Sequence, residues 1–237
     1  MARALSIVPL DGIGEIRPGD ELAELISAAA AAQGTPLAAR DCLVVTQKIV
    51  SKAEGRLVEL DPLDRDARRK LVESESVRIV RTRGDLIISE TRHGFVCTNA
   101  GIDLSNVDEG WAALLPVDSD RSAKHIRDAL RARTGVEVGV IVSDTFGRPW
   151  RQGLTDVAIG VSGIAAIVDL RDTPDATGRT LVVTEVAIAD EIASAAELVM
   201  GKAASVPVAI VRGLDREWFV EGSVRQLVRP PQEDLFR

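Results

Sequence analysis

The sequence predicts a protein that mixes helices and strands, and two features support this prediction. Short apolar runs rich in Val and Ile, residues 42–50 and 138–142 among them, are typical of strands buried within a sheet. Segments with the caps or the apolar stripe of a helix, such as residues 119–134 and 182–199, lie between or after these runs. The pattern fits an α+β fold of mixed sheets with flanking helices, and it fits a doubly wound sheet equally well.

Length and composition narrow the class of protein. The chain has 237 residues, enough for a sizeable core, and its 46% hydrophobic and 27% charged residues are typical of a soluble globular protein. No apolar run approaches the roughly 20 residues of a membrane helix, and the first residues enter a strand without the core of a signal peptide. We therefore expect a cytoplasmic protein that does not bind membranes.

Charge and cysteine content exclude further classes. A net charge of −7 argues against a general affinity for nucleic acid, so a polyanionic ligand would be held by a local cluster of basic groups and metal ions. Cys42 and Cys97 are too few, and too embedded in apolar sequence, for a disulfide scaffold or a thiolate metal site. We expect two buried free thiols.

The N-terminal part is predicted as strand, turn, helix and strand. Residues 4–10 form the first strand, and the turn at residues 11–16 contains two glycines that suit positive φ or close backbone approach. Asp20 is expected to cap a helix that continues through the alanines at 28–32. Residues 42–50 then form the second strand.

Two lysines flank the end of this second strand. Lys48 and Lys52, with Gln47 close by, would suit a rim that binds phosphate. The alternative, that the lysines simply flank a buried strand, is equally compatible with their spacing. The turn at 11–16 could offer backbone amides to a ligand, but it lacks the spacing of a Walker loop, and a plain turn is the favoured interpretation.

The middle of the chain is predicted as a helix and a hairpin. Residues 64–76 form a highly charged helix that faces solvent, and residues 77–91 form a hairpin that turns at Gly84. His93 follows, and its isolation from other candidate groups favours a surface or hydrogen-bonding role over catalysis.

A polar segment follows a third strand, which ends at Thr98. Asp103 comes soon after a glycine turn and could bind a divalent ion, while Asn106 could contact a base or a ribose. Asp and Asn are also ordinary turn formers, and for this segment alone that alternative is favoured.

The C-terminal half begins with a helix that Asp118 or Ser119 caps and Gly135 stops. We see no repeat, and no linker divides residues 1–215. The remaining elements are expected at residues 138–142, 155–161 and 164–170 as strands, 182–199 as an amphipathic helix and 206–211 as a last strand.

The most informative position is the predicted end of the strand at 138–142. Asp144 and Thr145 follow it and offer hard oxygen ligands suited to Mg²⁺ or Mn²⁺. Arg148 and Arg151 could face a phosphate or a carboxylate. The alternative is that Asp144 caps the turn and both arginines are solvated, and this stretch alone does not separate the two interpretations.

Three motifs considered together resemble one family. They are Lys52-Ala-Glu-Gly55; Asn99-Ala-Gly-Ile-Asp103 with Ser105-Asn106-Val107; and Ser143-Asp-Thr145 with Gly147-Arg148 and Ala158-Ile-Gly160. In this order they resemble the coenzyme F420:L-glutamate ligases, the gamma-glutamyl ligases that extend the tail of a deazaflavin cofactor. The resemblance covers nearly the whole chain, because residues 19–26 and 211–213 also match.

The resemblance implies a ligase that uses GTP to add L-glutamate to the deazaflavin acceptor F420-0 and its glutamylated products. The reaction would pass through an acyl phosphate and release GDP and phosphate. The enzyme would require K⁺ and two divalent ions, either Mg²⁺ or Mn²⁺. Lys52, Asp103 and Asp144 are expected to carry the catalysis. By position, the matches to GTP contacts are Ile13, Gly14, Glu15, Ile16, Gln47, Lys48, Lys52 and Asn106.

For the metals, the resemblance implies that Asp103 and Asp144 bind one ion and that Thr145 binds a second. One departure concerns the second site. Some members of the family carry an acidic residue after the Met-Gly that closes the long helix, where this chain has Lys202. That part of the second metal site therefore stays unassigned.

The resemblance also implies an architecture: an α+β fold of two intimately connected lobes that pairs into an intertwined homodimer. Residues 1–215 would form the ligase domain. The tail at 216–237 resembles the junction at which longer relatives continue into a nitroreductase-like domain. Two other functions remain open on the sequence, a metal-dependent nucleotide phosphohydrolase and a non-catalytic GTP-binding module.

Overall fold

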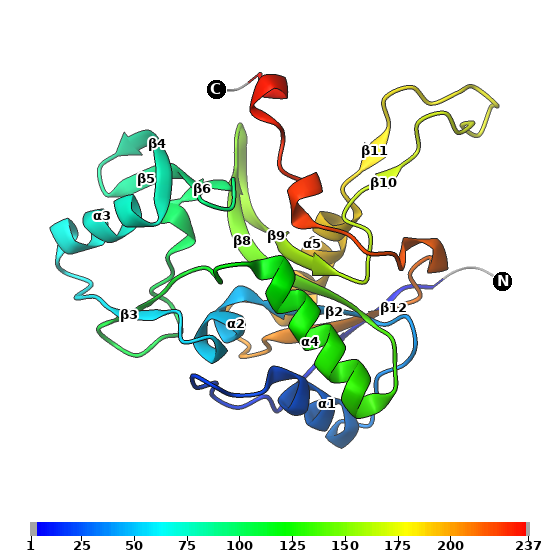
Figure 1. The fold of residues 1–237 in the computed structure, drawn as a ribbon, viewed down its shortest axis with the longest axis horizontal. Helices are drawn as coiled ribbons and strands as arrows, with labels where there is room; N and C mark the ends of the chain where they lie inside the picture. Colours follow the sequence, from blue (N-terminus) through cyan, green and yellow to red (C-terminus); the bar gives the residue numbers. More distant parts are fainter. Residues whose placement is uncertain (1–3, 236–237) are drawn as a thin grey trace.

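A five-stranded mixed sheet forms the centre of the molecule (Figure 1), which a computed structural model describes over residues 4–235. Its strand order is β1-β12-β2-β8-β9, and only β2 and β8 are parallel neighbours within it. The α+β expectation is confirmed, and the doubly wound parallel sheet is not what forms. The strands are β1 Ser6–Pro9, β2 Cys42–Thr46, β8 Gly139–Arg148, β9 Arg151–Ser162 and β12 Val208–Arg212.

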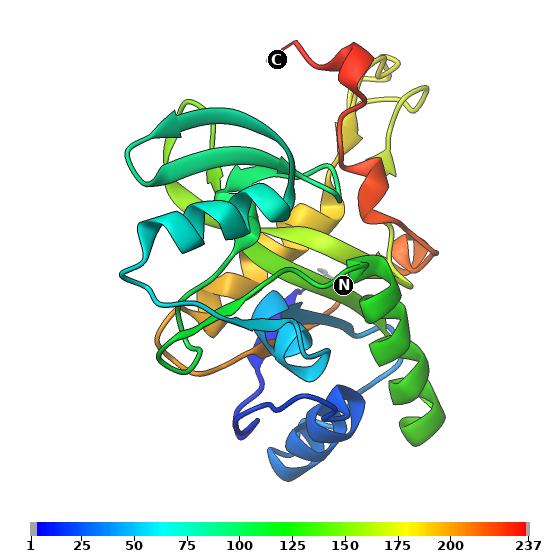
Figure 2. The same cartoon turned by 60° about the vertical axis from the view of Figure 1, so that its left-hand side comes forward.

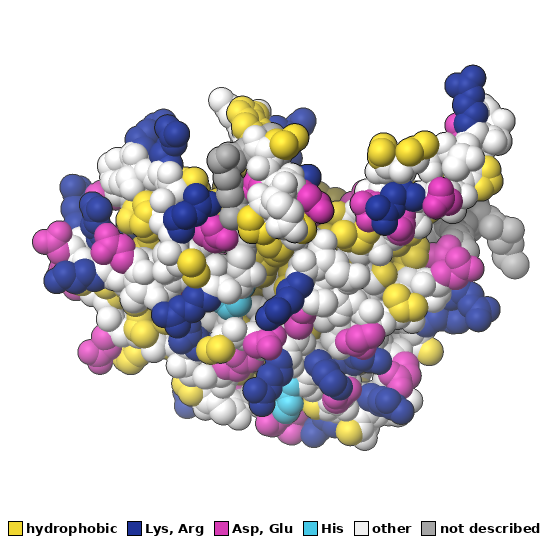
Figure 3. Space-filling model, turned by 45° about the horizontal axis from the view of Figure 1, so that its top comes forward, with side chains coloured by type: hydrophobic (Ala, Val, Ile, Leu, Met, Phe, Trp, Pro, Cys, Tyr) yellow, Lys and Arg dark blue, Asp and Glu magenta, His cyan; other side chains and the backbone are white. Residues whose placement is uncertain are grey.

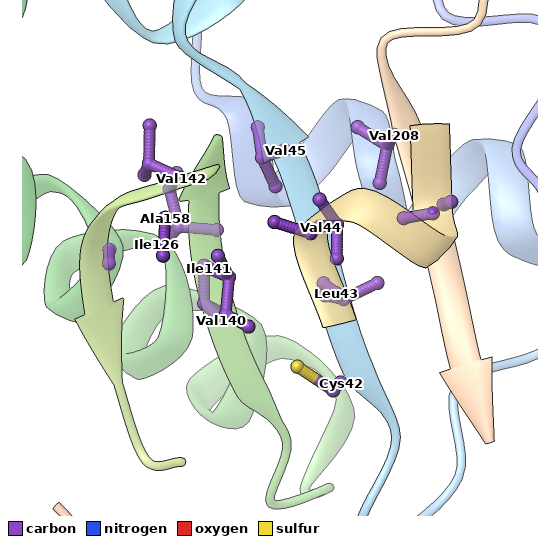
Figure 4. Close-up of a cluster of buried hydrophobic side chains, with 14 of the residues drawn as sticks. Cys42, Leu43, Val44, Val45, Ile126, Val140, Ile141, Val142, Ala158 and Val208 are labelled. Atoms are coloured by element: carbon purple, nitrogen blue, oxygen red, sulfur yellow. The ribbon is translucent and has the colours of Figure 1, made fainter. Parts of the chain in front are cut away.

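Helices cover both faces of this sheet (Figures 1 and 2). Helix α4 (Ser119–Thr134) packs on β8 and β9 and against α1 (Leu22–Ala32), while α5 (Ile188–Met200) packs on β9, β12 and β1. With both faces covered, an interior strand can be apolar at every position. This explains why the runs at 42–45 and 140–142 are completely buried (Figure 4).

The two cysteines are buried and free, as expected. Cys42 lies on β2 within the core (Figure 4). Burial, with a smaller contribution from the charge of Asp144, raises the pKa of Cys97 to about 12. Neither thiol is therefore available as a thiolate nucleophile near neutral pH.

Helix α4 has the ends that the sequence predicts. The Asp118 carboxylate accepts a hydrogen bond from the Arg121 backbone N–H at 3.0 Å, and Gly135 adopts the left-handed conformation at the C-terminus. The cap predicted for α1 is wrong. Glu21 holds the N-cap position, and the Asp20 carboxylate instead accepts from the Arg17 backbone N–H at 2.7 Å and closes the preceding turn.

The second strand is shorter than predicted, because it ends at Thr46 and the helix α2 (Gln47–Ala53) begins immediately. Ile49 and Val50 are buried on one face of this helix, although the same residues continue the apolar run of the strand. An apolar run of this length is compatible with either structure. The correction places Gln47, Lys48 and Lys52 on a helix rather than at a strand end.

Strand β8 is longer than predicted. It continues through Asp144 and Thr145 to Arg148, and the hairpin turns at Pro149 and Trp150. Pairing with β9 explains the extension. The register of this pairing shifts between Val142 and Ser143, and Asp144 then lies opposite Val157. The loop predicted after residue 142 is wrong. The polar side chains of this segment lie on a paired strand beside a β-bulge, and β-bulges commonly change the direction of side chains.

A three-stranded sheet carries the predicted hairpin and packs on the central sheet. Phe95 contacts Phe146 of β8 with ring centroids 6.0 Å apart, and His93 stacks on Phe95. His93 Nε2 also lies 2.9 Å from the Pro116 carbonyl oxygen, which confirms its hydrogen-bonding role. The elements of this region are α3 Arg65–Ser74, β4 Ser76–Arg83, β5 Leu86–Thr91 and β6 Val96–Thr98, followed by the 3-10 turn η1 Asn99–Gly101; β3 Leu57–Glu59 pairs with β7 Trp111–Ala113.

The segment between β9 and α5 differs most from the predicted elements. Residues 164–167 are not a strand, and β10 covers only Val168–Asp169, paired with β11 (Glu185–Val186). Helix α5 begins at Ile188 rather than at 182, because the preceding residues form an arm that projects from the body (Figures 1 and 3). Val182 and Val183, the first residues of the predicted helix, are both exposed on the arm.

Residues 216–228 pack on the core and include two short 3-10 turns, η2 Arg216–Trp218 and η3 Val224–Gln226, whereas a third turn, η4 Pro231–Glu233, is exposed. Val224 is buried in the main hydrophobic cluster, and Trp218 and Leu227 pack against it. The Ser223 hydroxyl donates to Asp120 of α4 at 2.7 Å. Among the described residues, no helix combines the length and the apolar character needed to cross a membrane.

Candidate active site

The candidate site lies where α2, the segment after β6 and strand β8 meet. Lys48 and Asp103, predicted from separate motifs, are in direct contact: Lys48 Nζ lies 3.0 Å from Asp103 Oδ2 and 2.7 Å from Ser105 Oγ. Asp103 Oδ1 also accepts from the Ser105 backbone N–H at 2.7 Å. Asp103 therefore forms an Asx turn and an ion pair at once, so the turn-former and ligand interpretations are not exclusive.

A left-handed turn positions Asp103. Asn99, Ala100 and Gly101 have φ values of 50°, 55° and 71°, a run that L-residues rarely adopt. The Asn99 side chain stabilises it by accepting from the Ile87 backbone N–H at 3.1 Å, and a Cβ on Gly101 would lie 2.8 Å from the side chain of Leu115. A backbone this constrained is typical of functional segments.

Lys52 joins α2 to the glycine-containing loop near the N-terminus. Its ammonium pairs with the Glu15 carboxylate, and the side chain of Lys52 is 11% exposed while that of Glu15 is 71% exposed. Gly14 is also exposed, whereas Ile16 is buried in the core and Ile13 packs against it. Any ligand at this loop would meet backbone groups and Glu15 rather than the isoleucine side chains.

Gln47 faces the interior. It is 1% exposed and donates from Nε2 to Ser51 Oγ at 2.8 Å and to the Leu114 carbonyl oxygen at 3.1 Å. Its Oε1 atom is buried and has no partner among the described residues. Its side chain thus connects α2 with the segment around Leu114. Asn106, by contrast, is exposed and has a φ of 55°.

Asp144 is partly buried among other carboxylates. Its pKa is raised to about 7, chiefly by burial and to a smaller extent by the charges of Asp103 and Asp156, while a hydrogen bond from the Thr145 backbone and the charge of Lys202 act to lower it. A carboxylate whose ionisation is opposed by like charges is a natural partner for an added cation.

Sequence reasoning missed Asp156, which lies on β9 and is 2% exposed. Its Oδ1 accepts from Thr145 Oγ1 at 2.6 Å and its Oδ2 from Ser143 Oγ at 3.2 Å. The available signal was a carboxylate at the start of the mostly apolar part of a predicted strand. Its register opposite Thr145, which gives it a role, depends on the β8–β9 pairing and could not be inferred locally.

Lys202 completes this group of charges. Its Nζ lies 3.1 Å from Asp156 Oδ1 and 3.0 Å from Glu197 Oε1, and it also donates to Thr145 Oγ1. Partial burial lowers the pKa of Lys202, but its hydrogen bonds and ion pairs with Glu197 and Asp156 outweigh that effect and leave the pKa above its ordinary value. Lys202 is therefore a permanent cation at neutral pH.

The predicted arginines lie apart from these contacts. Arg148 and Arg151 are exposed at the tip of the β8–β9 hairpin, where Arg148 Nη2 donates to the Gln152 carbonyl oxygen at 3.0 Å. This agrees with the solvated alternative. More widely, acidic and basic side chains are interspersed on the face in Figure 3, with no continuous basic surface on that side.

Comparison with known proteins identifies the family. The model of the F420-0:Gamma-glutamyl ligase family matches residues 12–213. The coenzyme F420:L-glutamate ligase of Methanothermobacter thermautotrophicus is 44% identical, over 98% of this chain and 99% of its own. The proteins of the same name from Methanopyrus kandleri and Archaeoglobus fulgidus are 43% and 38% identical, each over 98% of this chain and over 98% and 96% of their own. The chain belongs to the F420-0:gamma-glutamyl ligase family.

Proposed function

We propose that this chain is a coenzyme F420:L-glutamate ligase that joins glutamate to the deazaflavin acceptor F420-0 through a γ-linkage, with GTP as the source of the activating phosphoryl group. The observation that carries the proposal is the contact of Lys48 with Asp103 beside Asp144, in a chain that matches ligases of that name over almost its full length. A lysine of α2 and two carboxylates from separate segments of the chain lie near one another there, which suits the transfer of a highly charged group.

The donor atoms suit a divalent ion at Asp103 and Asp144. Both are hard oxygen ligands, and the raised pKa of Asp144 reflects its burial first and the charges of the nearby carboxylates second. Among residues 4–235, no group of three or more His, Cys, Asp or Glu side chains is preformed, so phosphate oxygens and water would complete the coordination. Mg²⁺ or Mn²⁺ bound there would supply charge neutralisation for the transferred phosphoryl group.

The lysines supply the remaining positive charge. Lys48 pairs with Asp103 and Lys52 with Glu15, so each ammonium is held near the site by an acidic partner. Both cations could then pass from these carboxylates to phosphate oxygens of the nucleotide, since an ammonium binds either group as a point charge.

The reaction proceeds in two steps. An oxygen of the acceptor carboxylate attacks the γ-phosphorus of GTP, GDP leaves, and an acyl phosphate results. The amine of glutamate then attacks the acyl carbon, phosphate leaves, and the nitrogen loses a proton to give the amide. No protein nucleophile is required, which agrees with cysteines that are both buried and have raised pKa values.

The test is incubation of the chain with F420-0, L-glutamate, GTP, K⁺ and either Mg²⁺ or Mn²⁺. We expect a mass increase of one or more glutamyl units, a γ-linkage on fragmentation, and GDP formed in step with the amide. Omission of the acceptor should nearly stop GTP consumption. Equal GTP hydrolysis without acceptor, with no adduct, would indicate a phosphohydrolase, and binding of GTP without cleavage would indicate a binding module.

A further inference from the structure

Lys202 connects three elements beside the candidate site. It follows α5 in the chain, and its ammonium reaches Thr145 on β8, Asp156 on β9 and Glu197 on α5. The Lys202 side chain is 57% exposed, whereas that of Asp156 is 3% exposed. The cation therefore approaches from the solvent side and covers a buried carboxylate.

Asp156 depends on that cation. A buried carboxylate is unfavourable unless it is paired and hydrogen-bonded. Two hydroxyl groups, of Ser143 and Thr145, donate to its oxygens, but they carry no charge. Of the residues that the structure describes, Lys202 is the one that forms an ion pair with Asp156.

We propose that the Lys202 ammonium is a tethered cation that occupies the place of a second divalent ion, so that this chain binds metal at Asp103 and Asp144 but not at Thr145. The oxygens that Lys202 contacts, one hydroxyl and two carboxylates, are of the kind that Mg²⁺ and Mn²⁺ bind. Lys48 contacts a single carboxylate, which it can leave for a nucleotide phosphate, whereas Lys202 is held by two carboxylates and a hydroxyl from three elements. An ammonium held in this way would strongly repel a divalent ion on the same atoms. The Thr145 position thus does not fit the second ion that the family resemblance implies.

A tethered cation differs from a bound ion in one functional respect. Its occupancy does not depend on metal concentration, because Lys202 cannot dissociate from the chain. The charge beside Asp156 and Glu197 is then fixed at plus one, where a divalent ion would contribute plus two. The proposal rests on the proposed function only for the metal at Asp103 and Asp144.

The test counts the Mn²⁺ ions bound per chain, by electron paramagnetic resonance of free Mn²⁺ during titration of the full chain. Lys202→Gln removes the charge but keeps a polar side chain, and we expect it to bind one more Mn²⁺ than the wild type. The matched control is Lys124→Gln, which removes an exposed lysine that pairs with Asp128 within α4, and it should leave the count unchanged. Adding Asp156→Asn to Lys202→Gln should abolish the extra ion.

The difference between variant and wild type tests Lys202, whereas the wild-type count tests the metal site of the proposed function. One bound ion in the wild type and two in Lys202→Gln support both the role of Lys202 and the Asp103–Asp144 metal site. No bound ion in the wild type and one in Lys202→Gln support the role of Lys202 but contradict the Asp103–Asp144 metal site. Equal counts in the two proteins overturn the inference, as do two ions in the wild type, a result that requires no variant to fold.

Discussion

Asp144, which we propose as a metal ligand, also makes the stability of the chain depend on pH. Burial and the neighbouring carboxylates Asp103 and Asp156 raise its pKa to about 7 in the folded chain, well above the value of about 3.9 for an unfolded aspartate. The folded chain therefore holds this proton more tightly than the unfolded chain. The resulting stabilisation is fully present below about pH 4 and is lost as the pH rises through 7.

We expect Asp144→Asn to stabilise the metal-free chain at pH 8 by roughly 1–3 kcal/mol and to have little effect at pH 4.5, because the neutral amide cannot ionise. Urea denaturation at the two pH values measures this difference. The same variant should lose most metal-dependent ligase activity, since an amide is a poor substitute for a carboxylate at a hard cation. An Asn variant with unchanged activity and metal titration would show that Asp144 is not a ligand.

Lys52 provides a second test at the residue level. Its side chain lies on α2, is 11% exposed and pairs with Glu15. The sequence placed Lys52 at the end of a strand instead and did not predict this ion pair. We expect Lys52→Ala to raise the KM for GTP roughly tenfold to a hundredfold, the equivalent of one charge-assisted hydrogen bond. Because its aliphatic stem is buried, the variant should also lose about 1–2 kcal/mol of stability.

A control for Lys52 is Lys124→Ala, which removes an exposed lysine from the outer face of α4. Steady-state kinetics and thermal melting of the two variants separate the roles of charge and packing. Unchanged GTP kinetics in Lys52→Ala, with only the stability lowered, would leave Lys52 a structural residue.

The next larger scale is that of helices and strands, where α4 meets β9 in a close backbone contact. A Cβ built on Gly160 would lie 2.3 Å from the backbone oxygen of Ser119, the first residue of α4. The neighbouring Asp120 carboxylate accepts from the Val161 backbone N–H at 2.8 Å. Glycine at 160 thus lets the start of the helix meet the strand backbone directly.

We expect Gly160→Ala to destabilise the chain by roughly 2–4 kcal/mol, since neither backbone can move without breaking its hydrogen bonds. The matched control is Gly147→Ala on β8, where an added Cβ meets nothing within 4 Å and φ is not positive. Urea denaturation of both variants measures the difference. A Gly160→Ala variant as stable as the control would mean that α4 shifts freely on the sheet.

Local signals predicted the elements well where the chemistry is local. The Asp118 cap and the Gly135 stop of α4 follow from single side chains, and the structure has both. The boundary at Thr46 and the extension of β8 did not follow, because an apolar run does not specify helix or strand and because pairing with β9 is a long-range interaction. Elements are predictable from sequence to the extent that their ends carry their own caps.

The candidate site follows the same division. Asp103, Asp144 and Lys48 could be named from their motifs, and the structure places them together. Asp156 could not be found, because its partners lie across a strand register that a β-bulge shifts. The sequence showed that Lys202 departs from the acidic residue that some family members carry at this position. The role of Lys202 could not be predicted, because it depends on contacts with three separate elements.

At the scale of the whole molecule, the arm formed by β10, β11 and the loop between them is the feature that the fold of one chain does not explain. It projects from the body (Figures 1 and 3), and it carries Val182 and Val183 with 74% and 84% of their surface exposed. Two neighbouring exposed valines on a projecting segment suit a protein–protein interface. Since the family resemblance implies a homodimer, we expect a second copy of the chain to cover them.

We therefore expect the chain to be a homodimer at micromolar concentration, and we expect Val182→Asp with Val183→Asp to shift it toward monomer, because two carboxylates would be desolvated at the interface. Sedimentation velocity over a range of concentrations measures the change. The matched control is Leu63→Asp, an exposed leucine between β3 and α3, on the side of the molecule away from the arm (Figure 1). A monomeric wild type, or a double variant that dimerises as tightly as the Leu63→Asp control, would show that the arm has another role.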